Sequence, residues 1–136
     1  MNGIEKLNKG LQDIFNWIAA RNKVLWQGAA GEGNTITVPG LQNYKTISIN
    51  TQYGNFMCCP DNGIISGLHA DRASPGTNLM THQVYGTISG DKITLIVCHY
   101  MEHVPGSGHG NKVPLQLVKI IGVEPIPAKI LSGGAL

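Results

Sequence analysis

Charge is scarce in this chain of 136 residues. Only 13% of the residues are Asp, Glu, Lys or Arg, against about 25% in typical soluble domains, and the net charge is +2. The Lys and Arg residues are scattered, and they form neither a basic run nor a basic patch interleaved with aromatic residues. Because nucleic-acid binding requires clustered positive charge, we expect no nucleic-acid partner.

Long apolar runs are also missing. No stretch approaches the roughly 18 residues that a membrane-spanning helix requires. Glu5 and Asp13 interrupt the N-terminal pattern where a signal peptide would have a continuous apolar core. We therefore expect no membrane insertion, and synthesis and assembly in a cytoplasm.

Cysteine is limited to Cys58, Cys59 and Cys98. An odd number with two adjacent members does not fit a disulfide framework. The sequence therefore predicts three reduced thiols that act as small core residues.

Motifs for catalysis and cofactor binding are missing as well. His99 and His103 stand four apart with His109 downstream, a spacing that suits zinc on a helix but separates two side chains by about 13 Å on a strand. Cys98 and His99 are neighbours on the same predicted strand, so their side chains point to opposite faces. We expect no catalytic residues, no metal site and no cofactor.

A regular apolar pattern is present at the N-terminus. Asn2 and Glu5 have the spacing of a capping box, which predicts the start of a helix. Five apolar residues then follow at intervals of 3, 4, 3 and 4: Ile4, Leu7, Leu11, Ile14 and Ile18. These are the a and d positions of a coiled coil, and we interpret them as an oligomerisation seam.

The residue types in the seam favour more than two strands. The first pair has Ile at a and Leu at d, as in dimers, whereas the following layers have Leu at a and Ile at d, as in trimers or tetramers. A parallel homotrimer is our preferred interpretation. The alternative is an amphipathic helix packed on its own domain, because the pattern covers less than three heptads.

The remainder of the chain reads as strands separated by Gly- and Pro-containing turns. We predict strands at 23–27, 35–38, 44–52, 56–59, 64–69, 80–89, 92–101 and 113–123, with a hairpin turn at Gly90 and Asp91. The predicted fold is mainly β: an antiparallel β-sandwich or jelly-roll-like domain (23–124) after one N-terminal α-helix (1–22) and before an extended tail (125–136). Residues 93–100 are apolar on both faces, which predicts that one face meets a neighbouring subunit.

Two loops are candidate recognition sites, because exposed loops on a rigid scaffold commonly bind partners. In the loop 102–112 we single out His103, His109 and Asn111; the other loop covers 71–81. Tyr53, Tyr85 and Tyr100 could offer stacking faces to a sugar ring, and half-buried packing is the alternative for each.

Three segments resemble a family of viral domains. They are the run Val-Leu-Trp-Gln-Gly from Val24, the run Asn-Thr-Ile-Thr-Val-Pro-Gly-Leu from Asn34 with Tyr-Lys-Thr-Ile-Ser-Ile from Tyr44, and the closing strand 117–123. Together they resemble β-domains of tail-fibre, baseplate or head-fibre proteins of tailed bacteriophages and prophages. The resemblance implies a trimeric β-domain on a coiled-coil stem, exposed on a virion, in contact with other virion proteins and with a host-surface glycan or receptor.

The sequence thus leaves three functional hypotheses. The first is a non-enzymatic phage virion structural protein that forms a homotrimer. The second is a carbohydrate-binding β-sandwich unrelated to virions. The third is a small metal-dependent enzyme that uses the histidines.

Overall fold

The computed structural model describes residues 2–72, 78–106 and 108–127. It is mainly β, with 57% strand, and has one helix at the N-terminus, as predicted. The helix α1 covers Gly3–Ala19, and two short 3-10 turns lie at Leu41–Asn43 and Pro60–Asn62. The strands are β1 Lys23–Ala30, β2 Thr35–Thr37, β3 Tyr44–Thr51, β4 Asn55–Cys58, β5 Ile64–Arg72, β6 Leu79–Ser89, β7 Lys92–Val104, β8 Gly108–His109, β9 Val113–Pro114 and β10 Leu117–Pro125.

The strands form two antiparallel sheets. One sheet has the order β1-β10-β3-β4. The other has the order β2-β7-β6-β5, and β8 and β9 also pair with β7. Successive short partners therefore line one edge of β7: β2 at residues 92–94, β9 at 99–100 and β8 at 103–104.

The hydrophobic core lies between the two sheets. The four-stranded sheet contributes Ile47, Ile49 and Ile120, and the six-stranded sheet contributes Ile65 and Leu95, all at most 1% exposed. At Gly67 the two sheets approach so closely that no side chain would fit between them. A Cβ on Gly67 of β5 would overlap the ring of Phe56 on β4, so this glycine allows the two sheets to pack.

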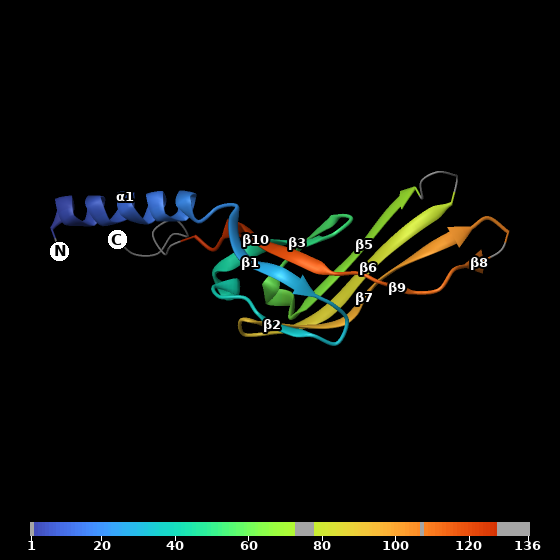
Figure 1. Cartoon of the computed structure of the whole chain (residues 1–136). Helices are drawn as coiled ribbons and strands as arrows, with labels where there is room; N and C mark the ends of the chain where they lie inside the picture. The colour runs from blue at the N-terminus through green and yellow to red at the C-terminus, as the bar shows by residue number, and fades with distance from the viewer. Residues whose placement is uncertain (1, 73–77, 107, 128–136) are drawn as a thin grey trace.

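The helix α1 projects away from the sheets, and the whole molecule is elongated (Figure 1). The last two turns of the helix and the residues after it reach the β-domain, at the end of the four-stranded sheet. Most of the length of α1 therefore stands clear of the described β-domain.

Several predicted strand limits were wrong, and bulges explain the main differences. In β7, Leu95 pairs with Gly86 and Val97 with Tyr85, so Ile96 is an extra residue that reverses the alternation. As a result, Leu95 and Cys98 both point into the core and Ile96 is exposed. The predicted strand 113–123 is divided into β9 and β10, and β1 continues through the predicted glycine turn to Ala30.

All three thiols are free, and Cys58 and Cys98 are buried as expected, but Cys59 is exposed and is not a core residue. Most of the predicted extended tail (128–136) and the centre of the loop 71–81 (73–77) lie outside the described residues.

Candidate functional site

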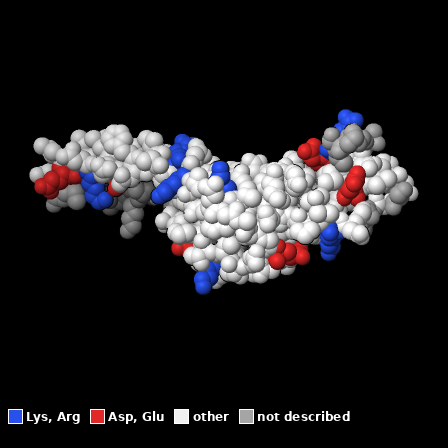
Figure 2. All heavy atoms as spheres, in the orientation of Figure 1, with Lys and Arg blue, Asp and Glu red and all other residues white. Residues whose placement is uncertain are grey.

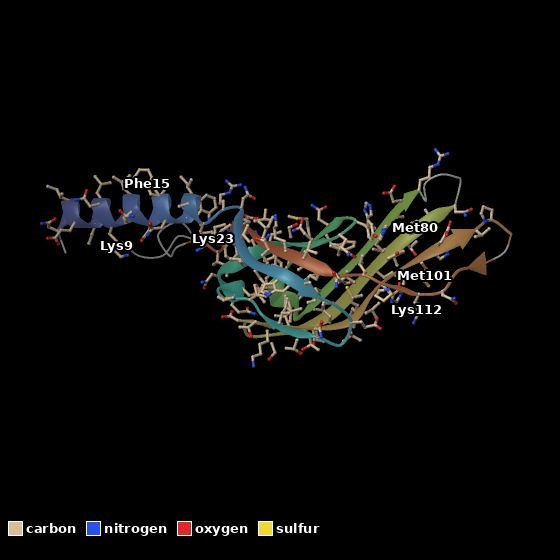
Figure 3. The ribbon with its side chains drawn as sticks, in the orientation of Figure 1. Lys9, Phe15, Lys23, Met80, Met101 and Lys112 are labelled. Carbon is tan, nitrogen blue, oxygen red and sulfur yellow. The ribbon has the colours of Figure 1, made fainter. Side chains whose placement is uncertain are left out.

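The apolar stripe of α1 is exposed. The exposed fractions of Ile4, Leu7, Leu11 and Ile18 range from 43% to 72%, and Ile14 is half-buried. Phe15, beside the stripe, is 61% exposed, and it projects from the opposite side of the helix to Lys9 (Figure 3). The described β-domain therefore does not cover the predicted seam, as it would if the helix packed on its own domain.

The start of α1 has the predicted capping box. Asn2 Oδ1 accepts a hydrogen bond from the backbone N–H of Glu5 at 2.9 Å, and Glu5 Oε2 accepts one from the N–H of Asn2 at 3.2 Å. The polar side of the helix carries an ion pair between Lys9 and Asp13 at 3.2 Å. Such contacts support the helix itself, and they leave the apolar side free to bind.

The end of α1 is attached to the β-domain by Trp17 and the residues after it. Trp17 Nε1 donates to the carbonyl of Pro125 at 3.0 Å, and the guanidinium of Arg21 lies 5.2 Å from the indole centroid. Tyr44 Oη donates to the carbonyl of Ala20 at 2.7 Å, and burial raises the pKa of this phenol. The helix is thus held at its base, and four of the five residues of its apolar stripe are exposed.

Four aromatic rings form a second feature, at the other end of the four-stranded sheet. His69, His82 and Tyr100 lie side by side across β5, β6 and β7, because His69 pairs with His82 and His82 with Tyr100. Tyr53 lies over them, with ring centroids 5.3 Å from His82 and 5.4 Å from Tyr100. Burial and the neighbouring phenol of Tyr53 raise the pKa of Tyr100.

The turn that carries Tyr53 is well hydrogen-bonded. Thr51 Oγ1 accepts from the backbone N–H groups of Tyr53 and Gly54, and it donates to the carbonyl of Gly54 at 3.0 Å. Tyr53 is nevertheless 52% exposed, so the turn presents one aromatic ring at the surface in a fixed position. Two of the three tyrosines that we singled out, Tyr53 and Tyr100, therefore come together. Tyr85 lies elsewhere, on the outer face of the six-stranded sheet.

A third feature is a hollow of about 360 Å³ beside β7. The hollow is lined by Gly31, Glu32, Cys98, His99, Lys112 and Pro114. The side chain of His99 is 8% exposed, and its Nδ1 lies 3.6 Å from Glu32 Oε1, which is too far for a hydrogen bond. His99 is buried because the turn that carries Glu32 covers it.

The groups around this hollow do not form a nucleophile–base pair. Cys98 Sγ points to the core and donates to the carbonyl of Leu115 at 3.1 Å, whereas His99 points to the outer face beneath Glu32. Burial, followed by the charge of Glu32, raises the pKa of the Cys98 thiol to about 11. The hydrogen bond from the Cys98 N–H is the main cause of the lowered pKa of Glu32. A thiol with a raised pKa is a poor nucleophile at neutral pH.

The candidate recognition loop is partly strand. His103 belongs to β7, and its Nε2 shares a hydrogen bond of 2.8 Å with Thr81 Oγ1. The backbone of His109 pairs with His103 through the short strand β8, and Asn111 is exposed after it. The backbones of His103 and His109 are therefore brought together. They form a hairpin that extends the six-stranded sheet, and not the irregular loop that the sequence predicted.

Within 2–72, 78–106 and 108–127, no three His, Cys, Asp or Glu side chains are placed to hold a metal ion. In the same part of the chain, α1 lacks the length and apolar character that a membrane crossing needs.

Comparisons with known proteins give no relative. No protein-family model, no curated protein and no solved structure matches this chain.

Of the three features, the stripe of α1 is the strongest candidate site. It combines five apolar side chains in a regular pattern, a capped helix and a fixed base. The sequence predicted its residues correctly as one face of a helix. No local sequence pattern indicated the Glu32–His99 hollow, because it joins residues 67 positions apart.

Proposed function

We propose that this chain is a structural protein that assembles as a homotrimer, with the helices α1 forming a short parallel coiled coil. The sheets then form the body of each subunit, as a jelly-roll-like sandwich beyond the stem. The role is non-enzymatic, and the partners are two further copies of the chain and other proteins of the same particle.

The observation that carries this proposal is the exposure of the a and d residues of α1. Leaving four Ile and Leu side chains largely in water is unfavourable, because each fully buried aliphatic side chain contributes roughly 1.5–3 kcal/mol. An isolated helix of this length is also marginal in water. Packing against identical helices buries the stripe and stabilises the helix at the same time.

The shape of the subunit supports the same arrangement. Because Trp17 and Tyr44 hold the base of α1 on the end of the four-stranded sheet, a parallel bundle of helices would place the β-domains together at one end. The result is a stem with a β-rich head (Figure 1). Lys9, on the polar side of the helix, would remain in solvent.

The setting that we propose is a phage virion. Its support is the resemblance of residues 24–49 and 117–123 to fibre and baseplate modules, together with the stem-and-head shape. A fibre, baseplate or head-decoration protein of this kind would be made in the bacterial cytoplasm and incorporated into the particle. Its head would then contact other virion proteins and a receptor or glycan on the host.

A pair of helix variants tests the assembly. Leu11→Asp places a charge in the middle of the seam, and Gln12→Asp places the same charge one residue away, on an exposed position outside the seam. Burying an unpaired carboxylate is costly, so Leu11→Asp should give monomers while Gln12→Asp keeps the assembly. Sedimentation equilibrium measures the masses, and far-ultraviolet circular dichroism checks that the β signal is retained. An unchanged mass for Leu11→Asp contradicts the proposed coiled coil.

A second candidate function is a carbohydrate-binding module unrelated to virions. The observation in its favour is the ring of Tyr53, which is exposed above His82 and Tyr100 on a hydrogen-bonded turn. Aromatic faces of this kind stack on the apolar face of sugar rings. A monomeric wild-type chain that binds methyl hexopyranosides in saturation-transfer NMR, and loses binding in Tyr53→Ala, would favour this alternative. The variant Tyr85→Ala is the control.

A further inference from the structure

The hollow beside β7 contains a buried histidine whose hydrogen bonds are not satisfied. The side chain of His99 is 8% exposed, and neither Nδ1 nor Nε2 has a hydrogen-bond partner among the described residues. The large majority of buried polar side-chain atoms in proteins are hydrogen-bonded, so an unpartnered imidazole requires an explanation. The neighbouring Cys98 differs, because its Sγ donates to the carbonyl of Leu115. The imidazole is therefore the group in this hollow that a bound molecule would satisfy.

The edge of β7 explains how a carboxylate comes to lie beside this imidazole. On that edge, β7 is paired with β2 and farther along with β9, and the turn after β1 lies against the stretch between them. Hydrogen bonds of 2.8 Å hold the turn, from the Gly33 N–H to the Leu95 carbonyl and from the Leu95 N–H to the Asn34 carbonyl. Glu32 Oε1 accepts the N–H of Cys98 at 3.2 Å. The carboxylate is thus held in place by hydrogen bonds that do not involve the imidazole.

The gap between the carboxylate and the imidazole has the size that one shared oxygen can bridge. Nδ1 of His99 lies 3.6 Å from Oε1 of Glu32. Two polar atoms slightly too far apart for a direct hydrogen bond are often joined through a third group. A neutral imidazole has one donor and one acceptor nitrogen, and a hydroxyl both donates and accepts. A ligand hydroxyl can therefore donate to the carboxylate and accept from the imidazole at the same time.

The charges around the hollow oppose one another. Glu32 contributes a carboxylate, and Lys112, just before β9 (Figure 3), contributes an ammonium group. The pKa of Glu32 is lowered chiefly by the N–H of Cys98, and the charge of Lys112 acts in the same direction. In the view of Figure 2, the acidic and basic side chains of the described residues are scattered over the β-domain and form no broad surface of one sign. These charges favour a neutral polar ligand over a free ion.

The size and the surface of the hollow narrow the ligand class further. Its volume of about 360 Å³ lies at the small end of the roughly 300–1,000 Å³ that ligand sites occupy. Pro114 and Gly31 add uncharged surface beside the polar side chains. A sugar ring carries hydroxyls next to C–H faces, which suits this mixture. A zwitterion such as glycine would compete with the attraction between Glu32 and Lys112, whereas neighbouring hydroxyls can bind both groups together.

We propose that the Glu32–His99 hollow binds one hexose unit of a glycan. One hydroxyl lies between the Glu32 carboxylate and the His99 imidazole, and a neighbouring hydroxyl accepts from the ammonium group of Lys112. The choice of a glycan rests on the proposed contact with a host surface, whereas the hollow itself belongs to a single subunit. In a trimer, three such sites would bind a repeating glycan with greater avidity than one site.

Saturation-transfer NMR on the 136-residue chain tests the proposal, with methyl hexopyranosides of gluco, manno and galacto configuration as probes. At least one sugar should bind, and the ring signals of His99 should shift during the titration. Lys112→Ala should raise the Kd at least about tenfold, because it removes a charged hydrogen-bond donor. The matched control is Lys92→Ala, which removes another exposed lysine outside the hollow and should leave the Kd unchanged.

A second variant tests the carboxylate. Glu32→Gln keeps an oxygen that can accept the N–H of Cys98 but removes the negative charge. The Kd should again rise at least about tenfold, because hydrogen bonds to charged groups are the stronger ones. Thermal melts check that the fold is retained. If Glu32→Gln is destabilised, Lys112→Ala decides the question, since that side chain is exposed.

Tyr53→Ala separates the hollow from the aromatic cluster at Tyr53. Sugar binding should persist in this variant. Loss of binding in Tyr53→Ala together with normal binding in Lys112→Ala would place the sugar on the cluster and overturn the proposal. A shift of the His99 ring signals by glycine, with no effect of any of the three sugars, would overturn it as well.

The outcomes also separate this inference from the proposed function. If none of the three sugars binds while the wild-type chain is a trimer, the glycan site is overturned and the proposed assembly stands. If a sugar binds to a monomeric chain and Lys112→Ala weakens the binding, the glycan site stands and the proposed homotrimer is overturned.

Discussion

The indole Nε1 of Trp17 donates a hydrogen bond to the carbonyl oxygen of Pro125, 3.0 Å away and 108 positions later in the chain. This contact joins the last turn of α1 to the end of β10. It fixes the direction in which the helix leaves the β-domain, and with it the position of the exposed stripe. The account of this protein as a stem on a β-rich head depends on that attachment.

Trp17→Phe should loosen the base of the helix. The variant keeps an aromatic side chain but removes the donor, so the free energy of unfolding should fall by about 1 kcal/mol. Chemical denaturation measures the loss in the Leu11→Asp background, where assembly does not contribute. Amides in the last turn of α1 should also exchange faster. Identical exchange in Trp17→Phe and its parent would show that the hydrogen bond does not hold the helix.

Asn2→Ala should fray the first turn of α1. The substitution removes the side-chain oxygen that accepts the N–H of Glu5, and loss of an N-cap typically costs about 0.5–2 kcal/mol. Because the helix must be formed before it can associate, the assembly should weaken by a similar amount. Circular dichroism at 222 nm, followed by sedimentation, measures both effects. Asn2→Ser should retain most of the wild-type behaviour, since Ser is also a good N-cap.

Gly86→Ala should destabilise the six-stranded sheet. A Cβ at this position would overlap the carbonyl oxygen of Thr94 on β7, and a backbone atom within a sheet cannot move aside. Overpacking in a core costs typically about 1–3 kcal/mol. Gly31→Ala is the control, because its Cβ would meet only the carbonyl oxygen of Leu115 at an ordinary 3.8 Å. Thermal melts with the same midpoint for both variants would contradict the strand packing between β6 and β7.

Stability should fall in alkaline solution because of Cys98. The pKa of this thiol is raised from 9.0 to about 11 in the folded state, so the unfolded chain loses the proton at lower pH than the folded one. The stabilisation is complete below pH 9 and is lost as the pH rises toward 11. Denaturation curves from pH 8 to 10.5 should show a shallower decline for Cys98→Ala than for wild type. Equal slopes would indicate that the thiol titrates normally.

Thiol labelling checks the same burial directly. In the native protein at pH 8, a thiol reagent should modify the exposed Cys59 quickly and Cys58 and Cys98 only on unfolding. The sequence predicted all three as core residues, and the structure corrects this for Cys59. Three fast-reacting thiols in the native protein would contradict the packing of Cys58 and Cys98.

The parts of the fold that follow local patterns could be predicted from the sequence. The capping residues Asn2 and Glu5, the alternation around Ile47 and Ile49, and the hairpin at Gly90 and Asp91 each depend on neighbours in the chain. The structure contains the capping box, these strand residues and this hairpin where the sequence predicted them.

The parts that depend on distant segments could not be predicted. The bulge at Ile96 follows from how β7 matches β6, and no local pattern marks it. The burial of His99 results from the turn that carries Glu32, and the cluster at Tyr53 from a turn placed over β6 and β7.

The mass of the 136-residue chain in solution tests the central claim most directly. Sedimentation equilibrium at micromolar concentration should give three times the chain mass of 14.5 kDa, and dilution should shift the protein toward monomer in one step. A single species of 14.5 kDa at every concentration, with the stripe of α1 still exposed, would contradict the account.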